Sequence, residues 1–145
     1  MSIDYLVAAL PALKFDEKPA ITGEELRARC GAALDGLDEA WKDLDVQLRN
    51  ALAEARGGGE YCKSAEGCSL YWKARVNECF QEKDVMKRET ALDRVRWDAA
   101  GELTEVSSPL GRGALYTYAI RLGIAEKRSR ISSEAGKEIF NRSLV

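Results

Sequence analysis

The sequence contains no histidine, so it lacks the commonest general base and the commonest neutral metal ligand. Proline is scarce: there are three, and none lies between Pro19 and Pro109, so a long central stretch has no helix breaker. No apolar run approaches the ~18 residues that span a membrane, and the N-terminus lacks the basic region and long apolar core of a signal peptide. These absences predict a non-enzymatic cytoplasmic protein that meets a membrane only as part of a complex.

The four cysteines do not form the paired C-x-x-C units of a structural zinc site; they lie at positions 30, 62, 68 and 79. Free thiols are the expectation in a reducing compartment. The triple glycine Gly57–Gly59 is followed by Lys63 and Ser64, but its spacing is not that of a phosphate-binding loop. We therefore expect no metal, no cofactor and no small-molecule substrate.

Charge is distributed unevenly along a chain whose net charge is only −2. The segment 109–145 carries seven basic and three acidic residues, a net charge of +4, which leaves −6 for residues 1–108. Such asymmetry is either an interaction surface or a set of ordinary solvated helix faces. Nucleic acid is an unfavoured partner, because no helix shows a base-reading cluster and the three tryptophans suit core packing better than base stacking.

The N-terminal half indicates helices with clear boundaries. The apolar stretch 2–13 fits either helix or strand. Thr22 and Glu25 form a capping box ahead of a helix, and Gly36 marks a break. The strongest amphipathic helix follows, with a stripe at steps of three or four residues: Leu37, Trp41, Leu44, Leu48, Leu52 and Ala55. The triple glycine should end it.

The second half continues in the same helical pattern. Helices are expected at about 66–81 and 83–100, either separate or joined. Their expected apolar stripes are Leu70, Trp72 or Ala74, Val76, Cys79 and Phe80 in the first, and Val85, Leu92, Val95 and Ala99 in the second. A loop is expected over 102–113. Beyond it, a tyrosine-bearing helix should end near Gly123, the stretch 124–131 is either extended or a continuation, and Ser132 or Ser133 can cap a last helix.

These patterns predict a mainly α protein, a bundle of about five to six helices with an N-terminal apolar segment of uncertain type. We expect a helical body over 1–108 and a basic helical segment over 109–145 that packs on it, in one domain.

The two ends of the chain resemble a family of uncharacterised bacterial proteins encoded with V-type (A-type) ATPase genes. The stretch Tyr5–Asp16 (YLVAALPALKFD) and the following Pro19–Leu26 are similar to the family's opening. Ala114–Arg128 (ALYTYAIRLGIAEKR) and Ser133–Phe140 (SEAGKEIF) are similar to its C-terminal block and closing helix. More distantly, the tail resembles the end of the V-type ATPase component, designated C or d, that caps the central rotor stalk.

The resemblance implies a non-catalytic helical subunit or assembly factor that docks to V-type ATPase subunits. The alternative is a free-standing helical adaptor or regulator that binds protein or nucleic acid through the basic C-terminal segment. In both cases the candidate partner-binding residues lie where the apolar helix runs into its charged tip: Tyr118, Arg121, Glu126, Lys127, Arg128 and Arg130.

Overall fold

The computed structural model describes residues 2–57 and 69–143, and in these ranges the chain forms a helical bundle without strands. The six α-helices are α1 (Ile3–Ala8), α2 (Gly23–Cys30), α3 (Leu37–Ala55), α4 (Leu70–Cys79), α5 (Val85–Ala100) and α6 (Arg112–Ser143). Two short 3-10 turns, η1 (Gly31–Leu34) and η3 (Gly101–Leu103), follow α2 and α5. The predicted class and number of helices are confirmed, and the N-terminal apolar segment begins as a helix. None of the described helices is long and apolar enough to cross a membrane.

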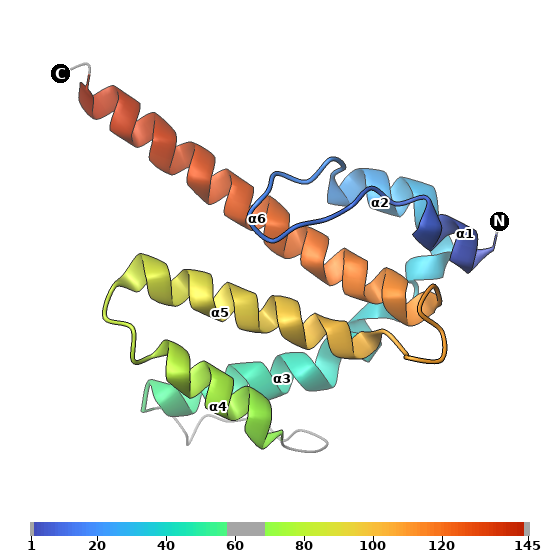
Figure 1. The fold of residues 1–145 in the computed structure, drawn as a ribbon, viewed down its shortest axis with the longest axis horizontal. Helices are drawn as coiled ribbons and strands as arrows, with labels where there is room; N and C mark the ends of the chain where they lie inside the picture. The colour runs from blue at the N-terminus through green and yellow to red at the C-terminus, as the bar shows by residue number, and fades with distance from the viewer. Residues whose placement is uncertain (1, 58–68, 144–145) are drawn as a thin grey trace.

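The helices are arranged around α6 and α5, which lie side by side (Figure 1). α3, α4 and α5 pack on one another around Trp41, Leu48, Trp72, Val76 and Val95. α1 and α2 pack on α6 around a second cluster that holds Ile21, Leu26, Cys30, Leu115 and Leu122. A third cluster joins the loop after α1 to α5 and α6 through Phe15, Trp97, Ile124 and Ala125. α6 therefore connects the N-terminal helices to the rest of the bundle.

Local signals in the sequence fix several helix boundaries. The Thr22 hydroxyl accepts a hydrogen bond from the Glu25 amide at 3.1 Å, which confirms the cap of α2. Gly36 has φ +88°, a left-handed conformation that favours glycine, and α3 begins directly after it. α3 ends at Ala55 as the triple glycine predicted; Gly58 and Gly59, like Cys62 and Cys68, lie outside the described residues.

The stretch 66–100 forms two separate helices. Asp84 accepts a hydrogen bond from the Lys87 amide at 3.1 Å and so caps α5, which stops a continuous helix from forming. The expectation that Leu70 and Val85 point into the core is wrong, because their side chains are 75% and 61% exposed. Each is the first residue of its helix, and the residues of that helix that pack against the bundle come later in the chain. Of the two alternatives in the stripe of α4, Trp72 is buried and Ala74 is exposed.

The predicted end of a helix near Gly123 and the predicted cap at Ser132 or Ser133 are wrong, because α6 is a single helix of 32 residues. Of the two alternatives for 124–131, the continuation of the helix is the correct one. One glycine costs a helix only about 1 kcal/mol relative to alanine. Burial of Leu122, Ile124 and Ala125 beside Gly123 outweighs this cost. At the start of α6, Gly113 permits close packing, because a Cβ there would lie 1.9 Å from the carbonyl oxygen of Leu103.

We expect Trp41→Ala to lower the free energy of unfolding by about 3–5 kcal/mol, because it leaves a large cavity in the α3–α4–α5 core. Trp41 is only 8% exposed there. Urea denaturation followed by circular dichroism measures the loss. Leu70→Ala is the control, with an expected change within about 0.5 kcal/mol. Equal losses in the two variants would show that Trp41 is not a core residue.

Candidate functional site

The first two of the six predicted partner-binding residues hold other parts of the bundle. The Tyr118 hydroxyl donates to the carbonyl oxygen of Pro11 at 2.8 Å. Arg121 donates from Nε to the carbonyl oxygen of Trp97 at 2.9 Å, and its guanidinium lies 5.3 Å from the centre of the Trp97 ring. Burial lowers the pKa of Arg121, because the charged form loses hydration. These two side chains are therefore bound within the protein.

Glu126 joins α6 to the start of α2. Its carboxylate accepts a short hydrogen bond from the backbone amide of Gly23, the first residue of α2. The first amides of a helix have no partner within the helix, and a negative charge there is favourable. The sequence predicted a role for Glu126 in partner binding, and the structure gives its carboxylate an internal role.

Lys127 and Arg128 meet at a buried carboxylate, Asp93 of α5, whose side chain is 8% exposed. Lys127 Nζ lies 2.8 Å from Asp93 Oδ1, and Arg128 Nη1 lies 3.6 Å from Oδ2. Arg128 also pairs with Asp16 at 3.1 Å and stacks on the Phe15 ring, 4.1 Å from its centre. A buried carboxylate needs such partners, since an isolated one would lose several kcal/mol of hydration. This network links α5, α6 and the loop after α1.

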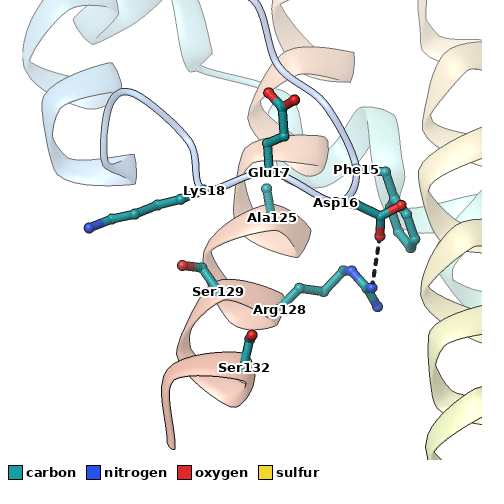
Figure 2. A pocket seen from close by; sticks show the side chains of 8 residues that line it. All are labelled: Phe15, Asp16, Glu17, Lys18, Ala125, Arg128, Ser129 and Ser132. Atoms are coloured by element: carbon teal, nitrogen blue, oxygen red, sulfur yellow. Dashed lines mark hydrogen bonds and ion pairs between the residues drawn. The ribbon is translucent and has the colours of Figure 1, made fainter. Parts of the chain in front are cut away.

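A hollow of about 520 Å³ lies beside this network, between the loop after α1 and α6 (Figure 2). Figure 2 shows Arg128 directed at Asp16, and the hydroxyls of Ser129 and Ser132 on the same side of α6. The charges in the lining are balanced, with Asp16 and Glu17 against Lys18 and Arg128. Within the described residues neither serine has a carboxylate partner of the kind that would activate a nucleophile. The polar lining of the hollow is better suited to contact with the surface of another molecule than to catalysis.

A second hollow of about 440 Å³ adjoins the first and shares Lys18 and Ser129 with it. Three exposed cations line it: Lys18 from the loop, Arg27 from α2 and Arg130 from α6. Two carboxylates oppose them, Glu24 and Glu126, and Glu126 is already bound to the Gly23 amide. No ion pair joins these three to a carboxylate in the part of the chain that the structure describes. We call this surface, lined by Lys18, Arg27 and Arg130, the basic hollow. Pro19 and Ile21 give it an apolar base.

The structure thus divides the six candidates. Five are used in contacts within the protein, and Arg130 is exposed in the basic hollow. Sequence reasoning missed Lys18 and Arg27, which come to Arg130 from more than 100 residues away along the chain. Neither lies in a motif, so only the packing of α2 on α6 reveals them.

No family model, no curated protein and no solved structure matches the chain. The resemblance of its two ends to proteins encoded with V-type ATPases stays a prediction. What the site can do is therefore argued from its geometry: a cationic hollow and a long helix that continues past it.

We expect Asp93→Ala to destabilise the fold by about 2–4 kcal/mol, because it leaves Lys127 and Arg128 without their buried carboxylate. Removal of one partner of a buried ion pair usually costs about 3–5 kcal/mol. We expect a smaller loss here, because the Lys127 side chain is 48% exposed and regains hydration. Asp16→Ala is the control, with an expected loss under about 1 kcal/mol, because Asp16 is 79% exposed. Chemical denaturation measures both. Equal losses of unfolding free energy in the two variants would show that Asp93 is not the main carboxylate of the network.

The folded protein should lose stability in alkali. Burial raises the pKa of the Cys30 and Cys79 thiols and of the Tyr118 hydroxyl, because their charged forms are poorly hydrated in the fold. Above the ordinary thiol pKa of about 8.5 the unfolded chain releases these protons first, so the free energy of unfolding falls as pH rises through the folded values. Urea denaturation at a series of pH values checks this. The double variant Cys30→Ala, Cys79→Ala should flatten the dependence, and an unchanged slope would contradict the assignment.

Proposed function

We propose that the protein is a non-catalytic helical docking subunit or assembly factor of a V-type ATPase, and that it acts by protein–protein contact. The basic hollow is the observation that carries the docking role. Three exposed cations from three segments converge there on a chain of net charge −2. The resemblance of the two chain ends to proteins encoded with V-type ATPases supports the identity of the partner.

The position of the basic hollow on α6 supports contact with a large partner. Arg130 lies in the second half of α6, 13 residues before its last residue, Ser143. The last turns of this helix project away from the other helices (Figure 1). A partner with an acidic surface could contact both the hollow and this projecting helix. Exposed cations contribute to the rate and specificity of such association more than to its affinity.

Co-purification tests the proposal. The tagged chain, expressed in its source organism, should retain V-type ATPase subunits, and the double variant Arg27→Glu, Arg130→Glu should lose them by about tenfold or more. Both residues are exposed, so the free energy of unfolding should change by less than about 1 kcal/mol.

Arg112→Glu is the matched control on the same helix. It lies 18 positions before Arg130, about 27 Å along the axis, and an acidic residue suits a helix N-terminus. It should retain the subunits. If the wild-type chain retains none of them, the V-type ATPase role is wrong. If the reversal of Arg27 and Arg130 has no effect, the basic hollow is not the docking surface.

The same three cations support the second candidate, an adaptor that binds nucleic acid. Affinity for DNA that falls steeply as salt rises, and that Arg27→Glu with Arg130→Glu abolishes, would favour this alternative. Absence of retention on DNA at low salt would remove it.

A further inference from the structure

A third hollow lies along α5 and α6 and shares no residue with the basic hollow. It is a groove of about 500 Å³ over α5, with α3 and α6 as its walls. Figure 1 shows α5 between these two helices. We call it the α5 groove; its exposed apolar surface comes from Leu52 of α3 and Ile120 of α6, above the buried side chains of Trp41, Leu92 and Ile124. We propose that this groove binds an acidic amphipathic helix of a partner protein.

The charges around the groove favour an acidic occupant. Its lining carries four cations, Arg49, Arg56, Arg96 and Lys127, against Glu89 and Asp93. Arg49 and Arg96 share one carboxylate, Asp45, at 3.0 and 3.3 Å. Arg56 lies over the Phe80 ring, 5.9 Å from its centre. Lys127 likewise shares its carboxylate, Asp93, with Arg128. A carboxylate of a ligand would therefore meet cations that either share a carboxylate with a second cation or lie over an aromatic ring.

Gly123 is the second reason to expect an occupant. It lies in the middle of α6, far from both helix ends. It is exposed to solvent and lines the groove. Glycine weakens a helix relative to alanine, yet nothing within the protein requires it: no atom lies within 4 Å of the position that its Cβ would take. The missing side chain leaves the backbone of α6 open on the groove wall, and close approach of another backbone is a common use of glycine.

A helix fits this surface best. Three helices already surround the groove, and a helix laid along α5 between α3 and α6 would complete a four-helix arrangement. Its apolar residues would contact Leu52 and Ile120, and its acids would face Arg49 and Arg56. This is the helix-in-groove mode of peptide recognition. The inference is independent of the basic hollow and of the identity proposed above.

The test uses the full chain and a panel of fluorescein-labelled amphipathic peptides of about 18 residues, with leucine on one helical face and glutamate on the other. The glutamate peptides should bind with micromolar affinity in fluorescence anisotropy and shift the Gly123 amide signal in NMR spectra. Gly123→Ala should weaken binding about fivefold while raising the melting temperature by about 3 °C, and Gly123→Leu should abolish binding. Loss of binding together with a gain in stability cannot arise from unfolding.

Controls separate charge from shape. Arg56→Gln should weaken binding about threefold, and Lys42→Gln, an equal change of charge on an exposed α3 residue outside the groove, should leave it unchanged. The proposal is overturned by equal binding of peptides with lysine in place of glutamate, by no binding up to about 1 mM, or by an unmoved Gly123 signal. Self-association of the chain that Gly123→Leu abolishes would show instead that a second copy covers the groove.

Discussion

The buried carboxylate of Asp93 is the charged centre of the contact between α5, α6 and the loop after α1, beside the apolar cluster that these segments share. It lies between Lys127 and Arg128, so it fixes α5 against α6 in one register. Arg128 extends the link to the loop after α1 through Asp16 and the Phe15 ring. A buried charge tolerates few alternatives, because any shift of the helices would leave it without partners. The positions of the basic hollow and of the α5 groove both follow from this register.

The consequence for the surface of α6 is a division of its faces. Residues 126 and 130 face the N-terminal segment and the basic hollow, whereas residues 123 and 127 face α3 and α5. Residues three or four positions apart share one face of an α-helix, so these four positions lie on one stripe of α6, and the two hollows border this stripe on adjoining sides. The charged residues of the segment 126–130 form one cluster in the sequence. In the structure they contribute to an internal network and to two surface hollows. Arg128 and Arg130 illustrate this: two residues apart, one stacks on Phe15 and the other is exposed.

The sequence was sufficient for the class of fold and for most helix boundaries, because these depend on local chemistry. The cap at Thr22, the break at Gly36 and the stripe of α3 are all set by residues within a few positions of one another. The continuity of α6 through Gly123 was not predictable in this way, since burial of its neighbours against distant helices decides it. The roles of Asp93, Lys18 and Arg27 were missed for the same reason. Each acquires its partners or neighbours only when segments far apart in the sequence come together.

The packing of α1 and α2 on α6 has a consequence for how the chain is made. The contacts that hold the N-terminal segment join residues far apart in the chain. The Gly23 amide donates a hydrogen bond to Glu126, 103 positions away, and the Tyr118 hydroxyl donates one to the carbonyl oxygen of Pro11, 107 positions away. The helices α3, α4 and α5 contact one another over much shorter separations and can pair early, because local loops close at small entropic cost. During synthesis, α1 and α2 emerge before α6, so their apolar faces lack this partner until α6 has left the ribosome. In this interval Val7, Leu10 and Leu26 are the residues that a chaperone would meet.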